Sequence, residues 1–312
     1  GIIIPVWCAN GFFQAMLWPP MVRIMAECMN DKWYKNSCVL VSMASSGATI
    51  AIYLVTPVCI QVSGWRAAFF LPAALGILAA LFWYWNTRKL EVGEAVPETE
   101  SAGSQGASAD GKHSLFIQLI VDAPLILILL AIILQGMLRD GITTWMPVYM
   151  SETFGMSNAK SILSAAALPL FSVFSVLLAS LLLDWLKSEV FTGACLFALG
   201  ALSGIAMLAA FDSLPVLCIL MMTLITGCAH GINLMLISRV PRHLTRYGKV
   251  SSVSGILNSA TYIGSSLSTY GFGAVAEQAG WMQVVVIWIA VCAAGMCIML
   301  LARKKWALFC GR

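Results

Sequence analysis

The segment "LAIILQGMLRDGITTWMPVYM", residues 130 to 150, is a long apolar run that carries Arg139 and Asp140 near its middle. A run of about 20 apolar residues has the length of an α-helix that crosses the hydrocarbon core of a bilayer. A charged side chain at mid-bilayer costs on the order of 3 kcal/mol, so it persists only where it faces a partner or an aqueous cavity. The segment therefore predicts a membrane helix whose charged residues face the interior of a helix bundle.

The whole chain has the composition of an integral membrane protein. Of its 312 residues, 60% are hydrophobic and 10% are charged, and the mean hydropathy is +0.88, whereas a soluble domain carries about 25% charged residues. The apolar runs lack the alternating pattern of an outer-membrane barrel. The ten cysteines lie mostly inside apolar segments without a CxxC pair, so we interpret them as small core residues. The sequence predicts an all-α integral membrane protein.

Apolar length and helix-breaking residues predict nine membrane spans. The spans cover residues 2–27, 37–62, 66–86, 122–149, 159–184, 190–211, 214–237, 250–276 and 281–302. Their connections alternate between short ones on one side and basic ones on the other. Of the 18 Lys and Arg residues, fourteen fall on the basic side or in the C-terminal segment, and only Arg66 and Lys160 fall on the side of the short connections. By the positive-inside rule the basic side is cytoplasmic. We therefore expect a multi-pass protein of the plasma membrane with a cytoplasmic C-terminus.

One long connection divides the chain. Residues 87–118 include the stretch "RKLEVGEAVPETESAGSQGASADGKHS", which is rich in Ser, Gly, Ala and Glu and poor in aromatic residues. Such a composition is typical of a flexible linker. It separates residues 1–86, with three spans, from residues 119–312, with six. The sequence thus predicts the remainder of an N-terminal bundle, a cytoplasmic linker and a six-helix C-terminal bundle.

Two short similarities relate these bundles. Gly64-Trp65 and Gly280-Trp281 each introduce the last span of a bundle, and the small-residue stretches 42–51 and 259–268 lie near the same offset from each other. Two matches in register indicate parallel repeats of six spans. If both bundles follow one design, the first lacks three spans. We therefore expect an N-terminally truncated chain, which also opens at Gly1 without a methionine.

Four motifs in this order carry a family resemblance. They are "NGFFQAMLWPPMVRIMAE" (10–27), "GWRAAFFLPA" (64–73), "LRDGITTWMPVYM" (138–150) and "GILNSATYIGSS" (255–266). Together they resemble the organophosphate:phosphate antiporter family of the major facilitator superfamily, the glycerol-3-phosphate and hexose-phosphate transporters. The resemblance implies a major facilitator fold, of which this chain carries nine of an expected twelve transmembrane helices in two bundles. It also implies secondary active transport of a small anionic metabolite.

The same resemblance suggests roles for individual residues. In the family two arginines hold the substrate phosphate, and Arg139 matches the one on the seventh helix, while the partner on the first helix would precede Gly1. Tyr262 matches a tyrosine of the eleventh helix. His230 stands where the family has a tyrosine on the tenth helix, and no histidine occurs near residues 44–46, where the family has one on its fifth helix.

Helical spacing gives an independent reading of the residues around Arg139. Gln135, Arg139 and Thr143 follow one another at i, i+4 and i+8, which predicts a polar stripe along the wall of an aqueous cavity. The planar fork of Arg139 matches a phosphate or a carboxylate, either of a substrate or of a structural partner. Asp140 points about 100° away, so we expect no direct pair between the two. Asp140 is then either an ion-pair partner of another helix or a proton-coupling carboxylate.

Two further helices offer candidate contacts. His230 is either hydrogen-bonded between helices or a pore-facing ligand and proton acceptor. Tyr262 either binds substrate or packs, and it belongs to a polar stripe with Asn258, Ser265 and Thr269.

The first span carries a predicted kink and a predicted ion pair. Pro19 and Pro20 remove two backbone donors, so the helix must bend there. Arg23 and Glu27 lie four residues apart near the basic side, which is typical of a gating or interfacial pair.

The sequence contains no GxxxxGK[ST] loop, no HExxH motif and no Ser/His/Asp set in a suitable context. We therefore expect no enzyme, no cofactor and no metal, and transport driven by a gradient. The leading hypothesis is organophosphate/phosphate exchange by alternating access. The alternatives are a proton-coupled symporter of a carboxylate or sugar-like solute, a membrane sensor of a phosphorylated sugar, and a remnant that does not transport.

The expected partners are a small anionic solute and the lipid bilayer, with no nucleic acid, and the protein is expected to be monomeric. A set of basic residues before the eighth span predicts a loop that meets anionic lipid. These residues are Arg239, Arg242, Arg246 and Lys249.

Overall fold

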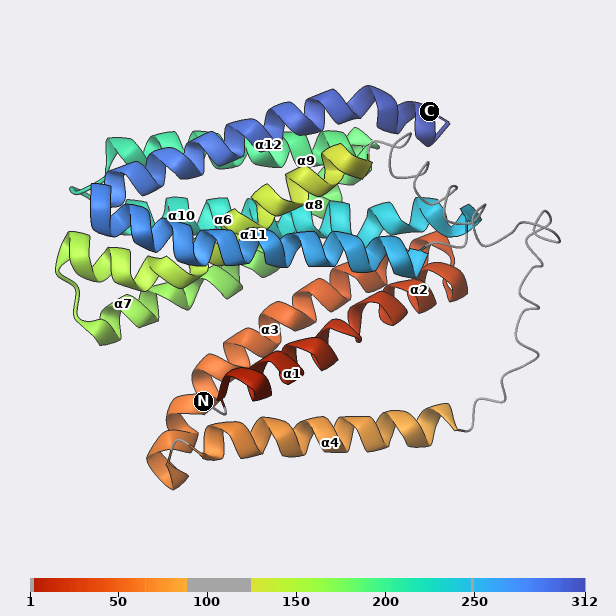
Figure 1. The fold of residues 1–312 in the computed structure, drawn as a ribbon, viewed down its shortest axis with the longest axis horizontal. Coiled ribbons are helices and arrows are strands. Elements are labelled where there is room, and N and C mark those ends of the chain that lie inside the picture. The colour runs from red at the N-terminus through yellow and green to blue at the C-terminus, as the bar shows by residue number, and fades with distance from the viewer. Residues whose placement is uncertain (1–2, 65, 89–124, 248–249, 312) are drawn as a thin grey trace. The chain divides into compact units, whose positions relative to one another are not determined.

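The computed structural model describes residues 3–64, 66–88, 125–247 and 250–311 (Figure 1). This part of the chain is 92% helical and contains no strand. Six of its helices are long and apolar enough to cross a membrane. The prediction of an all-α membrane protein is confirmed.

The chain divides into two compact units, Gly1–Gly47 together with Ala123–Arg312, and Ala48–Asp122. The larger unit contains α1 (Ile3–Ala15), α2 (Trp18–Cys28), the first half of α3 (Asp31–Ser63), α6 (Leu125–Phe154), α7 (Asn158–Ala165), α8 (Ala167–Leu186), α9 (Glu189–Ala209), α10 (Pro215–Asn233), η1 (Leu234–Arg239), η2 (Val240–Tyr247), α11 (Val250–Ala279) and α12 (Trp281–Phe309). The smaller unit contains the second half of α3 and α4 (Ala67–Thr87). The predicted linker, residues 87–118, lies almost wholly outside the described residues, and the predicted domain boundaries stay a prediction.

Each predicted span coincides with one helix or with two consecutive helices of the described residues. The first span is broken between Ala15 and Trp18, which confirms the kink predicted from Pro19 and Pro20. The fifth span is broken in the same way at Ala166, because Pro169 has no N–H to donate to the carbonyl of the residue four positions earlier. The nine spans therefore follow the sequence pattern, with proline setting the interruptions.

Helices α6 and α11 approach each other more closely than ordinary side chains permit, and Figure 1 shows them crossing within the bundle. A Cβ atom at Gly136 would collide with the backbone carbonyl of Thr261, and one at Gly264 would collide with the carbonyl of Ile133. Small residues allow such backbone contact between membrane helices. This contact places the polar residues of α6 against those of α11.

The end of α10 departs from α-helical geometry. The helix continues as the π-helix η1 and then as the 3₁₀-helix η2. Pro241 lies at this change and cannot donate a hydrogen bond to Ile237. Short π-helical segments are frequently found at functional sites, and this one carries Ser238 and Arg239.

Candidate functional site

Arg139 and Asp140 form a bidentate ion pair on α6. Arg139 Nε donates to Asp140 Oδ1 at 2.7 Å, and Nη2 donates to Oδ2 at 2.9 Å. The expectation that neighbouring residues on a helix would not pair is wrong here. Although their Cα–Cβ bonds diverge, the long arginine side chain curves back and brings its planar fork to the carboxylate.

Side chains from two other helices surround this pair. Asp140 lies beside the hydroxyl of Ser265 on α11 and within electrostatic range of His230 on α10. Arg139 lies within electrostatic range of Tyr262, also on α11. These five residues, Arg139, Asp140, His230, Tyr262 and Ser265, are called the central polar cluster below. The structure thus brings together the charged pair of α6 with the predicted candidates of α10 and α11.

The other two members of the predicted α6 stripe are engaged within the bundle. Gln135 is fully buried, and its Nε2 donates to the backbone carbonyl of Ala229 on α10 at 3.1 Å. Its Oε1 has no hydrogen-bond partner in the part of the chain that the structure describes. Thr143 donates its hydroxyl to the carbonyl of Arg139 at 2.6 Å. Gln135 faces α10 rather than a cavity, and contact of either residue with substrate stays a prediction.

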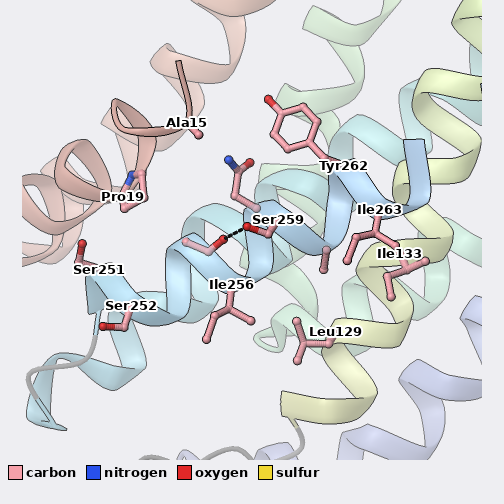
Figure 2. Close-up of a pocket in the computed structure, with 13 residues that line it drawn as sticks. Ala15, Pro19, Leu129, Ile133, Ser251, Ser252, Ile256, Ser259, Tyr262 and Ile263 are labelled. Carbon is pink, nitrogen blue, oxygen red and sulfur yellow. Dashed lines mark hydrogen bonds between the residues drawn. The ribbon is translucent and has the colours of Figure 1, made fainter. Parts of the chain in front are cut away.

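A pocket of about 650 Å³ adjoins the cluster. It lies between the break that separates α1 from α2, at Ala15 and Pro19, and the exposed face of α11. Figure 2 shows Ser259 and Tyr262 of α11 across from Ala15 and Pro19. Tyr262 lines the pocket and also lies within range of Arg139, so it connects the pocket to the charged pair.

Tyr262 has the exposure expected of a binding residue. Its side chain is 55% exposed, although it is a large residue in the middle of an apolar helix. The neighbouring Asn258 lines the same pocket. Thr269, the last member of the predicted α11 stripe, donates its hydroxyl to the carbonyl of Ser265 instead. Asn258 and Tyr262 therefore line the pocket and are available to a solute, whereas the hydroxyl of Ser265 bonds to Asp140 and that of Thr269 bonds within the helix.

Arg23 and Glu27 form the predicted pair on α2. Arg23 Nε lies 3.0 Å from both carboxylate oxygens, and the two side chains are 58% and 38% exposed. An exposed ion pair contributes about 0–1 kcal/mol. The pairing is confirmed, while a gating role stays a prediction.

Sequence reasoning missed a second polar cluster at the basic end of the same unit. Tyr34 of α3 donates its hydroxyl to the carbonyl of Ser238, and Lys35 binds Asp184 of α8. The partners of Tyr34 and Lys35 lie far away in the sequence, so no local sequence pattern predicts these contacts. The only available signal was that Tyr34 and Lys35 follow a helix start at Asp31.

The predicted contact with lipid is wrong for Arg239, whereas Arg242 is partly exposed and engaged in an ion pair. Arg239 is 8% exposed and directed into the bundle. Arg242 pairs with Asp31 at 2.7 Å and donates to the carbonyl of Met29 at 3.1 Å. Arg239 lies in the π-helix η1 and Arg242 in the 3₁₀-helix η2, a change of helix type that the sequence pattern of a continuous α-helix does not predict. The side chains of Arg246 and Lys249 lie outside the described residues.

Comparison with known proteins supports the resemblance. The chain is 23% identical to the "Probable hexose phosphate transport protein" of Chlamydia trachomatis, over 98% of this chain and 71% of that relative. It is 23% identical to the protein of the same name in Chlamydia pneumoniae, over 96% and 70%. It is 26% identical to the "Glycerol-3-phosphate transporter" of Bacillus subtilis, over 49% and 36%.

The predicted fold class and the predicted family resemblance are both confirmed. The sequence model of the Major Facilitator Superfamily matches residues 2–269. That match covers well over half of the 312 residues. The chain therefore belongs to the Major Facilitator Superfamily of membrane transporters.

Proposed function

We propose that this protein transports a small phosphorylated anion by exchange for phosphate, with Arg139 as the residue that binds the phosphate group. The observation that carries the proposal is the bidentate geometry of Arg139, which lies within electrostatic range of Tyr262, a residue that lines the pocket. A guanidinium fork that holds two carboxylate oxygens at hydrogen-bond distance can hold two phosphate oxygens in the same way. The names of the relatives, which refer to hexose phosphate and glycerol-3-phosphate, support this substrate class.

In this mechanism Asp140 occupies the place that the phosphate takes. Without substrate, the carboxylate neutralises the guanidinium inside the bundle. An arriving phosphate carries more negative charge and displaces it from the fork. Asp140 then keeps Ser265 and His230 as neighbours, and Tyr262 contacts the solute from the pocket side. Alternation between the two membrane faces would follow the rigid-body motion of bundles about a central site.

The test measures uptake of labelled phosphate by the full-length protein in phosphate-loaded liposomes. Arg139→Ala is expected to reduce exchange at least 100-fold, because the central polar cluster contains no other arginine or lysine among the described residues. Arg303→Ala is the matched control, since Arg303 lies exposed on α12 with its guanidinium over the ring of Phe191, and it should retain exchange. Undiminished exchange in Arg139→Ala would refute the role of Arg139. Binding of phosphate without any flux in the unmodified protein would instead support a membrane sensor.

A second candidate function is proton-coupled symport, which is favoured by the proximity of Asp140 to His230. Two titratable groups beside an anion ligand are suited to exchanging a proton during transport. This function predicts that solute uptake follows an imposed pH gradient and that Asp140→Asn abolishes this dependence. Exchange of phosphate that is insensitive to the gradient would exclude it.

A further inference from the structure

A buried arginine in the larger unit lacks a charged partner. Arg239, in η1, is 8% exposed. Its Nη2 donates to the hydroxyl of Ser180 at 3.2 Å, and its Nε has no partner among the described residues. Within that part of the chain no carboxylate lies at ion-pair distance from it. Burial of a guanidinium without an anion is unfavourable, so Arg239 calls for a functional explanation.

The acids nearest to Arg239 are bound to other groups. Asp184 and Glu189 interact with it electrostatically at longer range. Asp184, however, binds Lys35. Glu189 accepts hydrogen bonds on both oxygens, from His243 at 3.1 Å and from Trp306 at 3.2 Å. The positive charge of Arg239 is therefore not neutralised locally.

Two other donor atoms near Arg239 have no partner among the described residues, although Arg242 itself pairs through Nη2 with Asp31 at 2.7 Å. Arg242 Nη1 and the Ser238 hydroxyl are buried and have no partner in the described residues. The Arg242 guanidinium lies 4.3 Å from the centre of the Tyr34 ring, and both guanidiniums act electrostatically on Tyr34. Tyr34 itself bonds to the backbone of Ser238. Both guanidiniums and the backbone of Ser238 are thus neighbours of Tyr34 near the start of α3.

We propose that Arg239, Arg242 and Ser238 form a second oxyanion site, separate from Arg139, which binds the phosphate group of a small anion. In the conformation described, Tyr34 is the neighbour of both guanidiniums. Movement of the start of α3 away from η1 would leave the unpaired donors to an incoming anion. The identity of the anion rests on the proposed function, whereas the existence of the site rests on the unpaired donors alone.

The chemistry fits a phosphate group better than a lone halide. Arginine presents planar N–H forks that match tetrahedral oxyanions, and serine adds a hydroxyl donor. Two sources can supply such a group at a membrane face, namely free phosphate or a phospholipid headgroup. The burial of Arg239 favours the smaller, free anion.

The experiment follows thermal unfolding of the full-length protein in detergent, with inorganic phosphate added at constant ionic strength. Arg139→Gln provides the background, because it removes the central anion ligand. In that background, phosphate at about 100 times its dissociation constant should raise the midpoint by about 4 °C or more. Adding Arg239→Gln should abolish this shift. A phosphate shift that persists in Arg139→Gln/Arg239→Gln would overturn the proposal.

A second readout separates binding from a structural role. Without phosphate, Arg239→Gln should leave the midpoint unchanged or raise it, because it removes a buried charge that has no counter-ion. A structural role predicts a lower midpoint with the phosphate shift intact, which would also overturn the proposal. Ser238→Ala, which changes no charge, should weaken the phosphate shift, and Arg23→Gln is the control that should not.

Two further arms distinguish the source of the anion and the status of the proposed function. Stabilisation by dihexanoyl phosphatidic acid, but not by inorganic phosphate, would overturn the assignment to a free anion. Failure of the transport test at Arg139 would refute the proposed function and leave the unfolding result unaffected, because that result does not depend on flux.

Discussion

Asp140→Asn is expected to tighten the binding of phosphate at Arg139, because it removes the charge that competes for the guanidinium. Asparagine has the size of aspartate and keeps one oxygen acceptor, so the packing between α6 and α11 should persist. The expectation contrasts with that for Arg139→Ala, which removes the ligand itself. The two substitutions on neighbouring residues should therefore act on affinity in opposite directions.

The size of the effect follows from the geometry of the pair. Two N–H groups contact the carboxylate at 2.7 and 2.9 Å, and the side chains are 19% and 28% exposed. A hydrogen bond to a charged group contributes about 1.5–3 kcal/mol, and an exposed ion pair about 0–1 kcal/mol. For this partly exposed pair we take about 1–3 kcal/mol as the cost of displacing the carboxylate. Removing that cost should strengthen phosphate binding about 5- to 150-fold.

Isothermal titration calorimetry of the full-length protein with inorganic phosphate measures this change. Glu27→Gln is the matched control, since it removes a carboxylate from an arginine pair that is exposed and distant from the cluster in sequence, and it should leave affinity unchanged. Asp140→Glu keeps the competing charge and should resemble the unmodified protein more than Asp140→Asn does. Unchanged or weaker phosphate binding in Asp140→Asn would show that Asp140 does not compete with the anion.

Three other substitutions test the packing that positions these sites. Gly264→Ala should lower the unfolding midpoint strongly, at a cost of about 1–3 kcal/mol or more, because its Cβ would collide with the Ile133 carbonyl. Gly271→Ala is the control, since its Cβ meets nothing within 4 Å, and it should be tolerated. Equal midpoints for the two variants would refute the close contact. Tyr34→Phe should cost about 1–3 kcal/mol, because it leaves the buried Ser238 carbonyl with only the weak Cys38 thiol as a side-chain donor. An unchanged midpoint would contradict the bond from Tyr34. Lys35→Asp should reduce stability, and the charge-swapped variant Lys35→Asp/Asp184→Lys should restore it. If the charge swap does not restore stability, the two residues do not stabilise the protein as a pair.

The fold was predictable because a membrane helix is specified by local composition. A span needs about 20 apolar residues, and prolines mark its breaks, so residues 2–27 predicted both α1 and α2. Arg139 was found for the same reason, since a charge inside an apolar run is visible in the sequence. Its pairing with Asp140 was not, because the direction of a Cα–Cβ bond does not fix where a four-bond arginine side chain ends.

The basic-end cluster was hidden by a different cause. Arg239 follows an apolar run. The sequence pattern is the same whether the side chain of this arginine reaches the lipid surface or points into the bundle. Here the π-helix decides the direction. The partner of Ser238 is Tyr34, which lies 204 residues away. Contacts of that kind depend on how distant segments pack, and local patterns in a single sequence do not predict them.

The two arginines differ in how an anion would reach them, and this difference bears on exchange. Without substrate, Arg139 already binds the carboxylate of Asp140. The free energy of phosphate binding at Arg139 is therefore reduced by the cost of displacing that carboxylate. At Arg239 no carboxylate competes in the described residues, and access depends on Tyr34 and the start of α3. In these proposals, competition between two negative charges sets the affinity at Arg139, and movement of the start of α3 sets the affinity at Arg239. Asp140→Asn should then strengthen binding only at the first site, and Tyr34→Phe only at the second. Comparing these variants in backgrounds that lack Arg139 or Arg239 would separate the two contributions within one titration series.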